Sequence, residues 1–319
     1  MDGTPTNAPS IAPSILARIG NTPIVELHCM VPQGHARILM KLESQNPTGS
    51  MKDRAALAMI EAAERDGRLP RDGSVVEYTG GSAGVSLAFI CNAKGYPLRL
   101  VTSDAFSQEK RRHMEVLGAE LTLVPSKYGG MDEALTRNMI ETARGIREET
   151  GAYWTDQLNN RDQISGYEAL GAEIWRQTGG AVDAFVQGVG TAASLMGTAT
   201  ALRRERSDLH VVAVEPSESP VLSGGKQGAH RIEGIGAGFV VPLWAHDRVD
   251  EIATVPAAEA MEMARRLARE EAIFAGTSTG ANLVAALKVA EWLGPDATVV
   301  TLMVDSGMKY FSTELYGEV

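Results

Sequence analysis

The sequence predicts an α/β protein made of two open, twisted, mainly parallel sheets with helices on both faces. Short β-branched runs alternate with helical patterns along the whole chain. The expected strands are almost continuously apolar, as is typical of strands that are buried on both faces. The chain has 319 residues, a length that favours two domains over one. Glycine supplies 33 of them, about 10% against roughly 7% in an average soluble protein, which indicates many tight loops.

The elements follow one another as alternating strands and helices. Runs rich in Val, Ile, Leu and Thr between turn signals predict strands, and longer stretches with apolar residues three or four apart predict helices. The predicted strands cover residues 38–43, 75–78, 98–102, 121–125, 184–187, 211–215 and 299–304. The predicted helices cover residues 52–66, 107–117, 132–149, 194–206, 257–270 and 280–293. A joint near residues 150–153 follows a long charged helix, so we expect a larger domain of residues 1–42 and 151–319 and a smaller domain of residues 43–150.

Composition excludes several classes of protein. The formal net charge of −10 argues against a nucleic-acid binder, which needs a basic face. The six histidines form no HxH or HxxxH pair, and Cys29 and Cys91 stand far apart, so no metal site and no disulfide framework is expected, and both thiols are expected to be reduced and mostly buried. Residues 1–14 read as a loose polar tail without a signal peptide, and the uncharged stretch 184–202 is too rich in Gly, Thr and Ser for a membrane helix. A cytoplasmic protein with no membrane partner is the resulting expectation.

The segment from Asn46 to Arg54 carries the first candidate for chemistry. Ser50 is a good helix N-cap, and Asp53 three residues later completes the pattern of a capping box. Lys52 then falls in the first helical turn, where the positive end of the helix dipole should lower the pKa of its ammonium group. A lysine that must be neutral to form an imine suits that position, although a solvated surface lysine is an equally simple interpretation.

Two glycine-rich loops each lie between a predicted strand and a helix. Residues 77–84 read Glu-Tyr-Thr-Gly-Gly-Ser-Ala-Gly, and residues 188–194 read Gly-Val-Gly-Thr-Ala-Ala-Ser. Such turns let backbone N–H groups approach an anion at a helix N-terminus. The second loop contains no Lys or Arg, so a bound phosphate would be held by backbone N–H groups and hydroxyls. It also fits G-x-G-x-x-A, and Glu215 at the end of the next strand resembles a ribose-binding acid, so a nicotinamide-dependent enzyme stays an alternative.

Three further loops follow strands or precede helices, at residues 234–238, 276–280 and 305–307. Ligands bind at such places in α/β proteins, although plain structural turns are the simpler alternative for each loop. Residues 276–280 read Gly-Thr-Ser-Thr-Gly, but no His–acid pair is recognisable beside them, which disfavours a serine hydrolase.

Taken together and in order, these motifs resemble the cysteine synthase family of fold-type II pyridoxal-phosphate (PLP) enzymes, which have the architecture of the tryptophan synthase β-subunit. The resemblance runs from Ile19-Gly20-Asn21-Thr22-Pro23 to Ser312-Thr313. It includes Lys41-Leu42-Glu43 with residues 46–54, Glu215-Pro216 with residues 221–225, residues 233–239, and residues 305–313.

The resemblance implies a role for each matching residue. Lys52 would form the Schiff base with PLP and later remove the substrate Cα proton. Ser306 would face the pyridine nitrogen, and a neutral hydroxyl there suits β-elimination. The implied phosphate-binding residues are Gly190, Thr191, Ala192, Ala193 and Ser194. The implied contacts with the substrate carboxylate and the phenolic oxygen of the cofactor come from Thr79, Gly80, Ser82, Ala83, Gln157 and Gly236.

The chain departs from the family in those same loops. Where the family has Thr-Ser-Gly-Asn-Thr-Gly, this chain has Thr-Gly-Gly-Ser-Ala-Gly at residues 79–84. Ser82 replaces the Asn that would meet the phenolic oxygen, and Gly80 and Ala83 each lack a hydroxyl. Asp156 stands for the usual Asn, and Ala192-Ala193 for two glycines. The cofactor is therefore better determined by the sequence than the amino-acid substrate.

The function that the resemblance implies is β-replacement on an O-activated serine. O-acetyl-L-serine would lose acetate through an aminoacrylate intermediate, and sulfide or another small nucleophile would add to give L-cysteine or a relative. The alternatives are another substrate or nucleophile, dehydration of serine or threonine, a nicotinamide oxidoreductase, and a catalytically silent PLP-binding partner protein. A homodimer is also implied by the resemblance alone.

Overall fold

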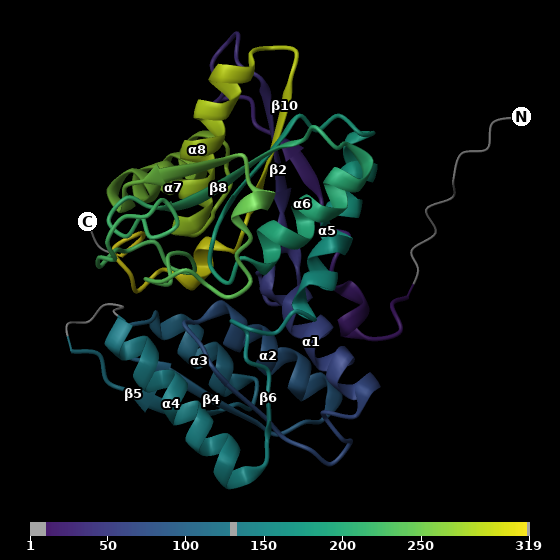
Figure 1. The fold of residues 1–319 in the computed structure, drawn as a ribbon, viewed down its shortest axis with the longest axis vertical. Coiled ribbons are helices and arrows are strands. Elements are labelled where there is room, and N and C mark those ends of the chain that lie inside the picture. Colours follow the sequence, from purple (N-terminus) through teal and green to yellow (C-terminus); the bar gives the residue numbers. More distant parts are fainter. Residues whose placement is uncertain (1–10, 128–132, 318–319) are drawn as a thin grey trace, which may run out of the picture.

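The computed structural model describes residues 11–127 and 133–317, and it confirms the predicted α/β class. Two sheets lie in two bodies, one above the other in Figure 1. The strand order is β1-β2-β10-β7-β8-β9 in the larger sheet and β5-β4-β3-β6 in the smaller sheet. Within the described residues, every neighbouring pair is parallel except β1 and β2.

The larger sheet consists of β1 (Ile24–Glu26), β2 (Arg37–Leu42), β7 (Ala184–Gly188), β8 (His210–Pro216), β9 (Glu251–Val255) and β10 (Thr298–Met303). The smaller sheet consists of β3 (Val75–Tyr78), β4 (Leu98–Ser103), β5 (Glu120–Val124) and β6 (Tyr153–Trp154). The helices are α1 (Lys52–Asp66), α2 (Ser82–Lys94), α3 (Gln108–Val116), α4 (Glu133–Thr150), α5 (Gln163–Thr178), α6 (Ala193–Glu205), α7 (Ala257–Glu270) and α8 (Thr277–Leu293). Figure 1 shows α1 to α4 around the smaller sheet and α5 to α8 around the larger one.

Both faces of the larger sheet are apolar and covered. Along β8, Val212 and Val214 belong to the core that includes α7 and α8, whereas Val211 and Ala213 belong to the core that includes α5 and α6. Successive side chains of a strand point to opposite faces, so a continuous apolar run supplies both cores at once. This explains why the strand pattern in the sequence is continuous rather than alternating.

The smaller sheet is built in the same way. Val75 packs in the core formed with α1, α2 and α3, and the next residue, Val76, packs against α4 on the other face. The strand β6 follows the joint expected near residues 150–153 and pairs with β3. The larger sheet resumes with β7, after helix α5.

Four elements are not identified from the sequence: β1, β6, β9 and α5. The strands β1 and β6 are only three and two residues long, and β9 is an edge strand that is only partly buried. Helix α5 contains Gly166 and Gly171, which read as breakers. In the structure they allow close helix crossings, because a Cβ atom on Gly166 would lie 2.6 Å from the Arg54 carbonyl oxygen and one on Gly171 would lie 2.6 Å from that of Thr198.

The predicted loop at residues 276–280 is wrong in one respect. Helix α8 begins at Thr277, three residues before the predicted start. Gly280 lies inside its first turns at a tight crossing with α7, where a Cβ atom would lie 1.9 Å from the Ala260 carbonyl oxygen. Ser278 is only 1% exposed, which removes it as an accessible nucleophile.

The loose tail expected over residues 1–14 lies mostly outside the described residues, as does the first residue of the helix expected over 132–149. No helix in residues 11–127 and 133–317 is long and apolar enough to cross a membrane.

Candidate active site

Lys52 begins helix α1 beside the carboxyl end of β10. The turn that precedes Lys52 is hydrogen-bonded to the segment that follows β10. The Met51 N–H donates to the Val304 carbonyl, and the Ser306 N–H donates to the Gly49 carbonyl, both at 3.0 Å. Gly49 has a φ of 75°, a conformation that favours glycine. The structure therefore brings together two segments that the sequence singled out separately, around Lys52 and around Ser306.

The predicted capping box at this helix is wrong. Asp53 turns away from Ser50, and its carboxylate accepts hydrogen bonds from the Thr48 N–H at 2.9 Å and the Thr48 hydroxyl at 2.5 Å. The N-cap position falls on Met51, and the Ser50 hydroxyl accepts from the Lys52 N–H at 3.2 Å. Asp53 is fully buried, and it stabilises the turn that presents Lys52.

The Lys52 amine has the electrostatic character expected from the sequence, but for a different reason. Burial lowers its pKa to about 8, and the nearby Asp305 carboxylate opposes that shift. Desolvation penalises the charged form of a lysine, whereas a neighbouring anion favours it. No residue in 11–127 or 133–317 accepts a hydrogen bond from this amine, so it is available to a ligand.

Ser306 lies directly after this junction. Its hydroxyl oxygen accepts a hydrogen bond from the Met308 N–H at 3.3 Å. The hydroxyl proton is left to donate to an acceptor such as a ring nitrogen.

The loop from Thr79 to Gly84 joins β3 to α2 and is organised by its own threonine. Thr79 is fully buried, and its hydroxyl oxygen accepts from the N–H groups of Gly81 and Gly84, both at 3.0 Å. Ser82 and Ala83 are the first two residues of α2. Their N–H groups have no carbonyl four residues back within the helix, so they are free to bind an anion.

Ser82 links this loop to the segment after β10. Its hydroxyl donates to Oδ2 of Asp305 at 3.0 Å, and the Tyr310 hydroxyl donates to the same oxygen at 2.8 Å. The other carboxylate oxygen of Asp305 is buried and has no hydrogen-bond partner in the described part of the chain. The two bodies of the molecule therefore meet at the candidate site.

The small residues of the loop leave room for two side chains from the region of α3. A Cβ atom on Gly80 would lie 3.0 Å from the ring of Phe106, and one on Gly81 would lie 2.5 Å from Cδ of Lys110. The Lys110 amine forms an ion pair with Glu233 in the other body. Neither Phe106 nor Lys110 was singled out in the sequence.

The predicted phosphate loop lies at the end of β7 and the start of α6. A Cβ atom on Gly190 would lie 2.4 Å from the Gly234 carbonyl oxygen, so the close approach requires glycine. The Gly236 N–H donates to the Val189 carbonyl at 3.0 Å, which places the 234–238 loop beside residue 190.

The side chains of this loop are held in place, and its N–H groups are left for a ligand. The Thr191 hydroxyl donates to the Gln163 side chain, and the Ser194 hydroxyl accepts from Gln187. Ala193 begins helix α6, so the first N–H groups of that helix have no internal acceptor. Ala192 has a φ of 68°, an unusual value for a residue with a side chain.

Glu215 is already occupied by the protein. Its carboxylate accepts from the N–H groups of Leu222 and Ser223 at 2.8 and 2.9 Å and from the Ser223 hydroxyl, and the residue is 1% exposed. An acid that binds ribose needs a free carboxylate facing the cleft. The predicted nicotinamide alternative is therefore overturned by this geometry.

Gln157 lies next to the start of the Thr79 loop. Its side-chain amide donates to the Tyr78 carbonyl at 2.8 Å, and its backbone N–H donates to the Glu77 carboxylate at 3.0 Å. Asp156, which stands where the family has Asn, has a φ of 46° and accepts from the Asn159 amide. The second amide hydrogen of Gln157 stays available to a ligand.

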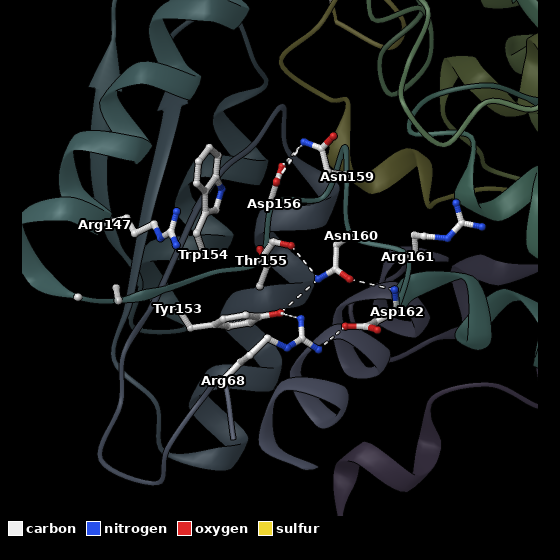
Figure 2. Close-up of a pocket in the computed structure, with 12 residues that line it drawn as sticks. Arg68, Arg147, Tyr153, Trp154, Thr155, Asp156, Asn159, Asn160, Arg161 and Asp162 are labelled. Carbon is white, nitrogen blue, oxygen red and sulfur yellow. Dashed lines mark hydrogen bonds and ion pairs between the residues drawn. The ribbon is translucent and has the colours of Figure 1, made fainter. Parts of the chain in front are cut away.

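A cavity of about 720 Å³ lies away from Lys52, along β6 and the connection to α5. Figure 2 shows Tyr153, Trp154 and Thr155 on one side of it and Asn160 and Asp162 on the other. Its arginines do not converge on one point in this view. The cavity lacks the lysine and the open helix N-termini of the candidate site, so we place the chemistry at Lys52 rather than here.

The described residues contain no group of three or more His, Cys, Asp or Glu side chains that could hold a metal ion. Both cysteines are free, but Cys29 is exposed and only Cys91 is buried, so the expectation of two buried thiols holds for Cys91 alone.

The sequence assigns no individual role to six residues of the site region, namely Glu77, Phe106, Lys110, Asp305, Lys309 and Tyr310. Glu77 carries the one usable signal, a charge inside a strand expected to be buried on both faces. Lys309 is 5% exposed with no hydrogen-bond partner for its amine among the described residues, and burial lowers its pKa to about 8.

Comparisons with known proteins show the family to which this fold belongs. The family model described as "Pyridoxal-phosphate dependent enzyme" matches residues 15–305. A cysteine synthase of Staphylococcus aureus is 43% identical over 300 residues, covering 93% of this chain and 95% of the relative. The structure of O-acetyl serine sulfhydrylase isoform 3 from Entamoeba histolytica is 35% identical with a TM-score of 0.90, covering 100% of this chain and 95% of the other. That of O-ureido-L-serine synthase is also 35% identical with a TM-score of 0.90, covering 96% of each chain.

Proposed function

The chain belongs to the family of pyridoxal-phosphate dependent enzymes, and from this premise we propose that it converts O-acetyl-L-serine and sulfide into L-cysteine and acetate. The bond from Cβ to the acetate oxygen breaks with its electron pair leaving on acetate, and a bond from Cβ to sulfur forms. One observation carries the proposal: Lys52, whose pKa is lowered to about 8, lies at the junction where Ser82 meets Asp305.

The residues present fit the cofactor. PLP, when bound, withdraws electrons from the Cα atom of an attached amino acid. The free amine of Lys52 would hold it covalently, and the backbone of Gly190–Ser194 at the start of α6 would bind its phosphate. Ser306 would donate its free hydroxyl proton to the pyridine nitrogen, and Ser82 would face the phenolic oxygen.

Lys52 also has the proton affinity that the reaction needs. An amine with a pKa of about 8 is partly neutral near neutral pH, so it both attacks a carbonyl carbon and removes a Cα proton more readily than an ordinary lysine. The Lys52 amine would hold the proton taken from Cα, where the Asp305 carboxylate stabilises the resulting charge, and would return it to Cα once the bond from Cβ to sulfur has formed.

The substrate carboxylate would be bound mainly by backbone groups. The donors would be the N–H groups of Ser82 and Ala83 at the start of α2 and the second amide hydrogen of Gln157, whose side chain is held by the carbonyl of Tyr78, the residue before Thr79. Since the hydroxyls usual in the family at positions 80 and 83 are absent, these N–H donors carry most of the recognition.

The direct test measures cysteine from the purified protein supplied with PLP, O-acetyl-L-serine and sulfide. We expect a visible imine absorption band and cysteine formation, both lost in Lys52→Ala. Release of keto acid from serine or threonine, without cysteine from O-acetylserine, would favour the dehydratase alternative. A different nucleophile giving the faster rate would keep the β-replacement and change the product. A coloured protein that turns over none of these substrates would be the silent binding protein instead.

Three finer expectations belong to the same proposal. We infer that the protein is a cytoplasmic homodimer of two-domain subunits, as the family resemblance implies. The expected division at residues 42–43 is kept, but the second one, expected at residues 150–151, is moved to the C-terminal side of Trp154, because β6 pairs with β3 in the smaller sheet. Light scattering tests the dimer, cell fractionation tests the compartment, and limited proteolysis between β6 and α5 tests the division.

A further inference from the structure

The side chain of Glu77 is a fully buried carboxylate in the middle of the smaller sheet. Oε1 accepts from the Tyr78 N–H at 2.9 Å and the Trp154 indole N–H at 3.2 Å. Oε2 accepts from the Thr155 hydroxyl and from the Gln157 N–H at 3.0 Å. Three of the four partners belong to a segment that is far away in sequence, residues 154–157.

The hydrogen-bond pattern favours a charged carboxylate. Three of the four partners are N–H groups, which only donate, so a protonated Glu77 would have to donate to the Thr155 hydroxyl, and its protonated oxygen would be a weaker acceptor for the Gln157 N–H. No cation forms an ion pair with Glu77 within the described residues, and burial raises its pKa to about 7 while these four bonds lower it. The charge is thus stabilised by the 154–157 segment itself, and the segment is in turn fixed by the charge.

The fixed segment is the one that carries Gln157 to the substrate loop. Figure 2 shows Trp154, Thr155 and Asp156 following one another along the chain at the edge of the cavity. Gln157 comes next, with its backbone held by Glu77 and its side chain held by the Tyr78 carbonyl at 2.8 Å. Tyr78 directly precedes Thr79, so both contacts set the position of Gln157 relative to the carboxylate-binding N–H groups.

We propose that Glu77 is a positioning residue for substrate binding, which acts by holding Gln157 in place beside the substrate-carboxylate loop. Glu77 is buried and does not touch the substrate. The segment from Trp154 to Gln157 consists of the end of a two-residue strand and a turn. The hydrogen bonds to the Glu77 carboxylate fix the position of this segment and so of Gln157. The inference rests on the proposed function in one respect, namely that Gln157 binds the carboxylate of an amino acid.

The substitution Glu77→Gln tests this with little change of shape. The amide of Gln has one carbonyl oxygen that can accept hydrogen bonds. Its NH₂ group would replace the other carboxylate oxygen and would face two groups that now donate hydrogen bonds to that oxygen. We expect the amino-acid concentration that half-saturates the change in cofactor absorption to rise about tenfold, the size of one lost orienting hydrogen bond. The KM for O-acetylserine should rise in parallel, while kcat and cofactor content stay within about twofold.

A double-mutant cycle with Gln157→Ala identifies the route of the effect. If Glu77 acts through Gln157, the double variant should bind the amino acid about as weakly as Gln157→Ala alone. Multiplied effects on half-saturation would overturn the inference, and so would an unchanged half-saturation in Glu77→Gln. A joint fall of cofactor content and kcat with unchanged KM would also overturn it, because it would indicate a purely structural role.

Asp183→Asn supplies the matched control. Asp183 accepts from the Thr298 N–H at 2.7 Å. Both residues lie at the amino ends of β7 and β10, whereas Lys52 lies at the carboxyl end of β10. The variant therefore also removes a carboxylate that is hydrogen-bonded to a backbone N–H group, but away from the candidate site. It should leave the half-saturation unchanged. The absorption readout needs no nucleophile, so it tests Glu77 even if sulfide proves to be the wrong co-substrate, whereas failure of the wild type to form cysteine would count against the proposed function alone.

Discussion

Ala192 offers a clean test of how the phosphate loop is built. It has a φ of 68° and a ψ of −20° at the N-cap of α6, a left-handed conformation in which the Cβ atom crowds the backbone. Its neighbour Ala193 is the first helical residue. The two side chains are 1% and 0% exposed, so the same substitution at each removes the same buried methyl group.

The difference between Ala192→Gly and Ala193→Gly isolates the backbone strain. Each substitution loses the burial of a methyl group, about 0.8 kcal/mol, and adds the conformational entropy of glycine in the unfolded chain, about 0.5–1 kcal/mol. Only Ala192→Gly relieves a left-handed conformation, which is a gain of about 1–2 kcal/mol. We expect Ala192→Gly to change the free energy of unfolding by less than about 1 kcal/mol, and Ala193→Gly to lower it by about 1.5 kcal/mol.

Urea unfolding of the two variants and the wild type, without PLP, measures these free energies. The free energy of unfolding should be about 1–2 kcal/mol higher for Ala192→Gly than for Ala193→Gly. Equal values for the two variants, or a lower value for Ala192→Gly, would refute the claim that residue 192 is strained. The affinity for PLP should be similar in both, because the phosphate would be held by N–H groups that neither substitution removes.

Three further predictions concern the candidate site. Without PLP in place, the Lys52 amine becomes neutral as pH rises through about 8, so the rate at which added PLP forms its absorbing imine should rise through that range; a rise centred near pH 10, as for an ordinary lysine, would contradict the buried site. Ser82→Asn should keep the cofactor and alter the preference among amino-acid substrates, measured by spectral titration, because it replaces the hydroxyl that reaches Asp305; an unchanged preference would count against the role of that loop. Gly80→Ser should lower the melting temperature by several degrees through contact with the Phe106 ring, and Gly80→Ser combined with Phe106→Leu should recover part of the loss.

The parts of the site that consist of short runs of consecutive residues could be predicted from the sequence. Lys52 after a turn, and the loop from Gly190 to Ser194 between a strand and a helix, are local patterns whose backbone geometry follows from glycine content and helix starts. The lowered pKa of Lys52 was also expected, but its cause was not. The position of Lys52 in the first helical turn predicted the right direction of the pKa shift, whereas burial in the folded chain is its main cause. Burial depends on residues that are distant from Lys52 in the sequence.

The contacts that join the two bodies could not be predicted in this way. Ser82 meets Asp305 and Lys110 meets Glu233 across separations that leave no pattern in a single sequence. Glu215 shows the converse problem. Its place at the end of a strand predicted a ribose-binding acid. In the structure, the Glu215 carboxylate already accepts three hydrogen bonds from residues 222 and 223. Only the folded structure shows that this carboxylate is not free to bind a ligand.

The departures of the loop at residues 79–84 from the family pattern are matched by their neighbours. The ring of Phe106 lies where the side chain of a larger residue at position 80 would begin, and the stem of Lys110 lies against position 81. The glycine at position 80 therefore does more than remove a hydroxyl, because the apolar ring of Phe106 fills the space beside it and excludes water from that space. Under the proposed function, recognition of the carboxylate would then depend on the N–H groups of α2 and on Gln157. It follows that restoring Ser at position 80 alone cannot restore the usual specificity, since the hydroxyl would have to share its space with the Phe106 ring.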